Sequence, residues 1–211
     1  MTGHPRPRSA AAGPVTDPAA VPGTGPAAED DLDHGVRYLA AIPLHAGRDT
    51  ATLRRWAQAA AEFGASLPPG PEEPSVRVVE RDGGLARGLL ARYTSRPPAV
   101  ELYTDAVAEA ERLIDAHGWR AWFPPGSVRA AALAHEAVHD RLHHGPGRAA
   151  LKRSLGHTAL RLGRLRVPAH VAGAEELAAH AYAQAVCGLG RSPLLLSAAL
   201  AASTTPPREK K

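Results

Sequence analysis

The residues from Ala134 to His143 combine histidines and a glutamate in a spacing that suits metal-dependent hydrolysis. His135 and His139 are four positions apart, so in a helix their imidazoles lie on one face, one turn apart. Two imidazole nitrogens placed in this way can bind one Zn²⁺ ion, and Fe²⁺ or Mn²⁺ can use the same donors. Glu136 lies about 100° round the helix, where its carboxylate can take a proton from a metal-bound water. The pattern HExxH therefore predicts a metal site with a glutamate general base.

A metal held by two imidazoles needs a third protein ligand, and the sequence offers two candidates. His143 is eight residues beyond His135, about 12 Å along a straight helix, which is too far for one ion to bind both. After Asp140 the next acidic residues are Glu175 and Glu176, which begin a predicted helix. Either of these two glutamates is expected to complete the site, although acidic residues also suit the start of a helix for electrostatic reasons.

Two segments resemble a known family of metallopeptidases, over residues 98–190. HEAVHDRLH, at residues 135–143, is similar to the HExxHxxLH signature of the ImmA/IrrE-type metallopeptidases. EELAAHAYAQAVC is similar to their later helix, which reads roughly E-x-x-A-N-x-F-A-x-x-L-L. The resemblance aligns Glu176 with the ligand glutamate and places His180 where the family usually has asparagine. It implies a zinc-dependent endopeptidase of gluzincin type, whose protein substrates are often transcriptional regulators.

Peptide hydrolysis also needs a donor that stabilises the oxyanion of the transition state. The sequence offers four candidates without ranking them: Tyr103, His143, His180 and Tyr182. An extended substrate is expected to pair with a free strand edge at residues 100–104, because main-chain pairing fixes register without strict side-chain demands.

The elements that must hold these residues predict an α+β fold, and the resemblance implies that it is zincin-like. The segments 75–80 and 85–93 alternate apolar and polar residues around a turn, which predicts an antiparallel pair, and residues 99–104 predict a further strand. We expect a small antiparallel sheet packed on several helices, including the HExxH helix and a helix that donates the glutamate. The predicted helices are 50–64 with Asp49 or Thr50 as cap, 104–117 capped by Thr104, 127–144, 148–165, 173–188 and one from about 192.

The sequence predicts four regions along the chain. Residues 1–28 are rich in Pro, Gly and Ala without periodic apolar residues, which indicates a disordered tail. Residues 29–74 predict a helical N-terminal extension, 75–205 the zincin-like metallopeptidase domain, and 206–211 a flexible tail.

Composition narrows the cellular setting. The chain has 211 residues and a single cysteine, Cys187, so an internal disulfide framework is excluded and a cytoplasmic protein is expected. The longest apolar run is far shorter than the roughly 20 residues that a membrane span needs, so no membrane contact is expected.

The segment 141–174 is basic and contains no acidic residue. Such a run is usually a solvated helix face, but it can also contact nucleic acid or an acidic partner. Two alternatives to the peptidase therefore remain: a non-catalytic metal-binding regulatory protein, and a DNA-associated protein that uses residues 141–166. The basic residues are Arg141, Arg148, Lys152, Arg153, Arg161, Arg164 and Arg166.

Overall fold

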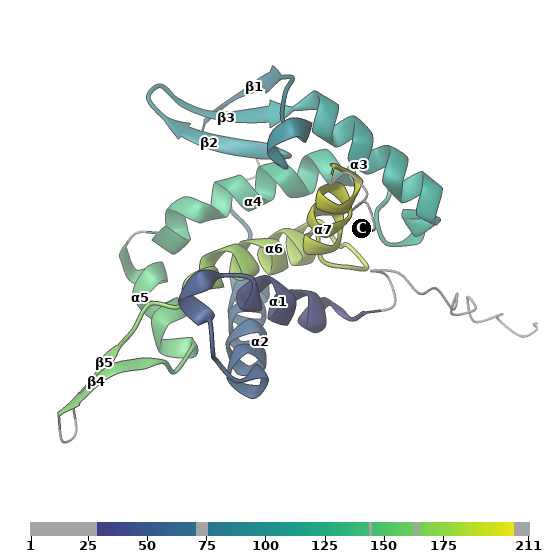
Figure 1. Ribbon diagram of the computed structural model, residues 1–211. Helices are drawn as coiled ribbons and strands as arrows, with labels where there is room; N and C mark the ends of the chain where they lie inside the picture. The colour runs from purple at the N-terminus through teal and green to yellow at the C-terminus, as the bar shows by residue number, and fades with distance from the viewer. Residues whose placement is uncertain (1–28, 71–75, 144, 163–164, 205–211) are drawn as a thin grey trace, which may run out of the picture.

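The computed structural model describes residues 29–70, 76–143, 145–162 and 165–204, and it is an α+β structure (Figure 1). Both predicted tails, 1–28 and 206–211, lie outside these residues. Among the described helices, none combines the length and the apolar character of a membrane span. The helices are α1 (Asp31–Ala40), α2 (Thr50–Ser66), α3 (Thr104–His117), α4 (Ser127–His143), α5 (Gly145–Ser154), α6 (Ala174–Val186) and α7 (Leu194–Thr204), with short 3-10 turns at Pro43–His45, Leu85–Arg87 and Trp119–Ala121. The strands are β1 (Arg77–Arg81), β2 (Ala91–Ser95), β3 (Pro98–Tyr103), β4 (Thr158–Leu162) and β5 (Leu165–Pro168).

The larger sheet is mixed, with the strand order β1–β3–β2. Strand β3 pairs with β1 in parallel and with β2 antiparallel, so the prediction of a wholly antiparallel sheet was wrong. The predicted hairpin between 75–80 and 85–93 was also wrong. The N–H groups of Gly83, Gly84 and Leu85 instead donate to the carboxylate of Asp105. The 3-10 turn Leu85–Arg87 follows, and β2 then lies on the far side of β3.

This strand order changes the expected substrate edge. The segment 100–104 belongs mainly to the central strand, and both of its edges are already paired. The prediction of a free edge there was therefore wrong. Strand β2 is an edge strand, and it lies against α4.

The α2 helix begins as predicted but does not end as predicted. The side chain of Asp49 accepts a hydrogen bond of 2.8 Å from the N–H of Thr52, which is an N-cap. The helix continues through Gly64 to Ser66. Gly64 serves close packing instead, because a Cβ on it would lie 2.0 Å from the carbonyl oxygen of Ala178 in α6. This glycine therefore lets α2 approach the helix that carries Glu176.

Two other local predictions fail for identifiable reasons. Thr104 does not cap α3, because its hydroxyl donates to the carbonyl of Arg81 instead. The helix predicted over 148–165 ends at Ser154, since Gly156 takes a left-handed conformation with φ of 61°. Leu and Arg then alternate with a period of two, which is a strand pattern, and β4 and β5 form an antiparallel hairpin. The predicted helices near 173–188 and 192 are confirmed as α6 and α7.

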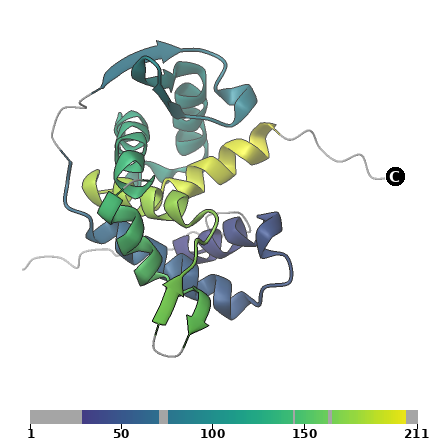
Figure 2. The same cartoon turned by 90° about the vertical axis from the view of Figure 1, so that its left-hand side faces the viewer.

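Two apolar clusters hold the helices together. One contains Leu53 and Trp56 of α2, Val138 and Leu142 of α4, and several residues of α6. The other joins α3 and α7 to the N-terminal half of α4 and to Ala183 of α6. Helices α4 and α6 therefore pass through both clusters, and Figure 2 shows them at the centre of the molecule. The segment predicted as an N-terminal extension shares the first cluster with α6.

Candidate metal centre

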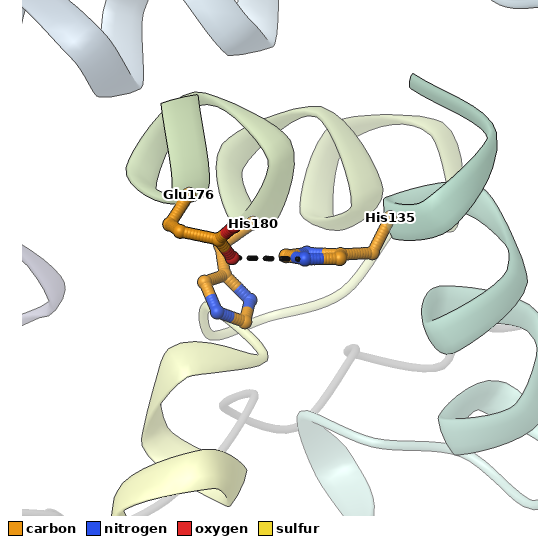
Figure 3. A group of neighbouring side chains, drawn as sticks. All are labelled: His135, Glu176 and His180. Carbon is orange, nitrogen blue, oxygen red and sulfur yellow. Dashed lines mark ion pairs between the residues drawn. The ribbon is translucent and has the colours of Figure 1, made fainter. Parts of the chain in front are cut away.

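The side chains of His135, His139 and Glu176 meet where α4 packs on α6. The Nε2 atoms of the two imidazoles are 3.0 Å apart. The two carboxylate oxygens of Glu176 lie 3.2 Å from Nε2 of His135 and 3.4 Å from Nε2 of His139. Figure 3 shows the contact between Glu176 and His135. The two Nε2 atoms of α4 and the two carboxylate oxygens of Glu176 in α6 therefore lie together.

The local backbone explains why Glu176 faces this point. Helix α6 begins directly after Gly173, which has a φ of 79° and so reverses the chain at little steric cost. A Cβ on Gly173 would lie only 2.5 Å from the side chain of Ile42 and 2.9 Å from that of Tyr38. Only glycine at position 173 leaves room for these side chains to pack against the start of α6. Glu176 lies in the first turn of that helix.

Each of the two imidazoles has one oxygen of Glu176 at a distance that suits neighbouring ligands in a tetrahedral zinc site. Bonds of 2.0–2.1 Å from Zn²⁺ to nitrogen and oxygen place neighbouring ligand atoms about 3.3 Å apart. The observed separations of 3.0, 3.2 and 3.4 Å are close to this value. Two imidazoles and one carboxylate are also a donor set that suits Zn²⁺, with a fourth position left for water or substrate. The residues present therefore fit such an ion.

The charge state of Glu176 suits this role. Burial would raise the pKa of Glu176, but the hydrogen bond and the charge of His135 outweigh burial, and together with His139 they lower that pKa to about 2. The carboxylate is therefore ionised at neutral pH, as a metal ligand must be.

Glu136 lies beside these residues, with a carboxylate oxygen within 4.8 Å of ligand atoms of His135 and His139. One oxygen of its carboxylate accepts a hydrogen bond of 2.8 Å from the backbone N–H of Tyr93 in β2. Burial raises the pKa of Glu136, and the nearby His135 and this N–H oppose the rise only in part. A carboxylate with a raised pKa is a better proton acceptor, which is what a general base requires.

Glu175, the alternative ligand, points elsewhere. Its side chain is buried, and its Oε1 atom lies 3.3 Å from Nδ1 of His170. The structure thus brings Glu176 and not its neighbour to the two imidazoles. Glu175 and Glu176 are adjacent in the sequence, and adjacent side chains point about 100° apart around a helix, so only one of them faces the imidazoles.

His180 lies next to the three ligands, one turn after Glu176 (Figure 3). Its ring centroid is 4.5 Å from that of His135, and its Nδ1 is buried without a hydrogen-bond partner among the described residues. Ligand atoms of His135, Glu176 and His180 all lie within 4.8 Å of one another. Burial holds the pKa of His180 well below its usual range, so its ring is neutral.

The other predicted oxyanion donors are not brought to this point. The hydroxyl of Tyr103 is part of the sheet, where it donates to the carboxylate of Glu101. The hydroxyl of Tyr182 accepts a hydrogen bond of 2.8 Å from the N–H of Gly70. The side chain of His143 lies outside the described residues.

Tyr38 is a neighbour of the centre that the sequence did not predict. It lies on α1, and burial, followed by the charges of Glu176 and Glu175, raises its pKa to about 12. The phenol therefore remains protonated and can donate a hydrogen bond. No pattern within α1 signals this proximity, because the contact of α1 with the start of α6 exists only in the folded chain.

Comparison with known proteins gives no match: no family model fits the chain, and neither a curated protein nor a solved structure is significantly similar to it.

Proposed function

We propose that this chain is a zinc-dependent endopeptidase with a zincin-like fold. The observation that carries the proposal is the convergence of His135, His139 and Glu176 at 3.0–3.4 Å. The resemblance of residues 135–143 to the HExxHxxLH signature of the ImmA/IrrE-type metallopeptidases supports it. So does the separation of the two glutamates into one ligand and one base.

Zinc bound at this centre would lower the pKa of a water molecule and polarise a peptide carbonyl. Glu136 then accepts the proton of the attacking water and passes it to the departing amine. The phenol of Tyr38 is a candidate donor to the oxyanion, since it remains protonated near Glu176.

Strand β2 offers a place for an extended substrate. It is an edge strand, and the N–H of Tyr93 points towards Glu136 instead of into the sheet. A peptide that pairs along Ala91–Ser95 would therefore lie beside the general base. Such pairing suits protein substrates, including regulator proteins, because it uses main-chain groups that every sequence has.

The decisive experiment compares Glu136→Gln with the wild type. Zinc content, measured by mass spectrometry of the purified proteins, should stay near one ion per chain, because Glu136 is not a ligand. Hydrolysis of a proteome-derived peptide library should fall by about 10²–10⁴-fold, the usual contribution of a general base. His139→Ala should lose both zinc and hydrolysis. Equal hydrolysis by wild type and Glu136→Gln would refute the proposal.

The position of His180 favours a second candidate, a non-catalytic metal-binding regulator. With His180 as a fourth protein ligand the site would be closed, as structural zinc sites are. Absorption spectra of the Co²⁺-substituted protein distinguish the two functions. Spectra that change on adding a small anion indicate an open position, whereas spectra that do not respond indicate four protein ligands.

A further inference from the structure

Positive charge is concentrated in the part of the chain that follows the metal-binding histidines. Between residues 141 and 174 there are seven Lys and Arg residues and no Asp or Glu. One of the seven already has partners within the fold, because Arg141 donates to the carbonyl of Pro68 and lies over the ring of Tyr182. Arg148 and Arg153 of α5 are exposed, and Lys152 is half-buried.

The cations of α5 have no carboxylate partner among the described side chains, a state that they share with five arginines elsewhere: Arg48, Arg55, Arg77, Arg87 and Arg96. Eight arginines on other elements form ion pairs with carboxylates at 3.9 Å or less: Arg37, Arg54, Arg81, Arg92, Arg112, Arg120, Arg129 and Arg191. Among the described side chains, no such pair involves Arg148, Lys152 or Arg153. No carboxylate in the described part of the chain compensates these three charges, and an external anion could do so.

The hairpin β4–β5 extends this basic region away from the helices (Figure 1). Its strands pair only with each other. In the ladder Arg161 is opposite Arg166. Like charges at paired positions destabilise a hairpin, and a hairpin of two strands is marginal by itself. An anionic partner would neutralise the paired arginine charges and would add contacts that stabilise the hairpin.

The geometry points to a double-stranded nucleic acid as that partner. A ribbon of two strands fits the major groove of a duplex, which is about 12 Å wide. Arginine pairs with phosphate oxygens through two parallel hydrogen bonds, and all the cations that α5 and the two strands carry are arginines except Lys152. The segment 141–174 has no aromatic residue, whereas single-strand binders use aromatic stacking and membrane-surface segments use aromatic anchors.

We propose that α5 and the β4–β5 hairpin form an arm that binds duplex nucleic acid through its phosphates. The arm consists of Arg148, Lys152, Arg153, Arg161 and Arg166. It is independent of the proposed peptidase activity, since none of these residues belongs to the metal centre. Binding would bring the chain to duplexes of any sequence and concentrate it near proteins bound there.

The test is fluorescence anisotropy of the full chain with a labelled 30-base-pair duplex of arbitrary sequence. Each neutralised phosphate contributes about −0.9 to the slope of log K against log salt, so five contacts give about −4.5. The affinity should then fall about 500-fold between 50 and 200 mM salt. No binding at 50 mM salt would overturn the proposal, because electrostatic contacts are strongest there.

A charge-matched pair of variants tests the location of the arm. The double variant Arg161→Ala with Arg166→Ala should change the slope of log K against log salt to about −2.7. The affinity for the duplex should then fall only about 40-fold between 50 and 200 mM salt. Arg54→Ala with Arg112→Ala removes the same charge from arginines that already have carboxylate partners, so it should leave the slope unchanged. Equal loss in both double variants would overturn the proposal. So would binding to phosphatidylserine vesicles that duplex does not compete away. Zinc content, measured in parallel, verifies that each variant is folded.

Discussion

The carboxylate of Glu136 accepts a hydrogen bond of 2.8 Å from the backbone N–H of Tyr93. This bond ties the proposed general base to the edge strand on which a substrate would pair. The donor belongs to the main chain, so it is present whatever side chain stands at position 93, proline excepted. The sheet and the HExxH helix are therefore linked at the residue that handles the proton.

Replacing Tyr93 by proline should shift the pH dependence of hydrolysis. The N–H of Tyr93 lowers the pKa of Glu136 against the effect of burial, so its removal should raise that pKa further. A base is active only when deprotonated, and the acidic limb of the kcat/KM profile should therefore move to higher pH. Tyr93→Ala keeps the N–H and is the control. An acidic limb at the same pH in both variants would contradict this role.

Replacing Glu175 and Glu176 separately by glutamine should show which of them binds the metal. Glu176→Gln should weaken zinc binding by at least about 10-fold, since it removes an ionised ligand, and Glu175→Gln should leave it unchanged. Titration with a competing chelator measures both affinities. Weaker binding in Glu175→Gln alone would reverse the assignment.

The phenol of Tyr38 should contribute to turnover more than to binding. Tyr38→Phe removes a donor that a transition state would use, so kcat should fall about 10²–10³-fold with little change in KM. Tyr182→Phe is the matched control, because its hydroxyl already has Gly70 as a partner. An unchanged kcat in Tyr38→Phe would exclude the phenol from the reaction.

Local patterns predicted the helix that carries the histidines and the helix that carries Glu176, because both rest on contacts one turn apart. They could not choose between Glu175 and Glu176, since that choice depends on how α6 is rotated against α4. The strand order failed for a similar reason: the carboxylate of Asp105 reshapes a turn about 20 residues earlier in the chain. Tyr38 was missed because α1 meets α6 only through tertiary packing.

Gly64→Ala should destabilise the protein although it lies in a helix. Alanine normally stabilises a helix by about 0.5–1 kcal/mol relative to glycine. Here the added methyl group would meet the carbonyl of Ala178 at 2.0 Å, and overpacking of this kind costs about 1–3 kcal/mol. Urea denaturation measures the difference. A variant more stable than the wild type would show that α2 and α6 are not in such close contact.

The contribution of Asp105 to the stability of the fold, through its hydrogen bonds to residues 83–85, should decrease in acid. Desolvation would raise the pKa of Asp105, but the backbone N–H groups of residues 83–85 outweigh it and lower that pKa below its ordinary value of 3.8. Its ionised form therefore stabilises the fold above about pH 3.8, and this contribution is lost as the pH falls further. Asp105→Asn should be less stable than the wild type at pH 7. Thermal unfolding should show the gap narrowing towards pH 3, and a constant gap would contradict this account.

Helices α4 and α6 are each held by two apolar clusters, and His139 and Glu176 lie on the stretches that the first cluster packs. Because both clusters consist of apolar side chains, we expect them to form without the ion, in contrast to a zinc finger, which unfolds when its metal is removed. A cell short of zinc would thus keep its stock of intact chains in an idle form. When the zinc supply returned, those chains would bind zinc and regain the proposed hydrolytic activity without new synthesis. The zinc concentration in the cell would then set the level of that activity.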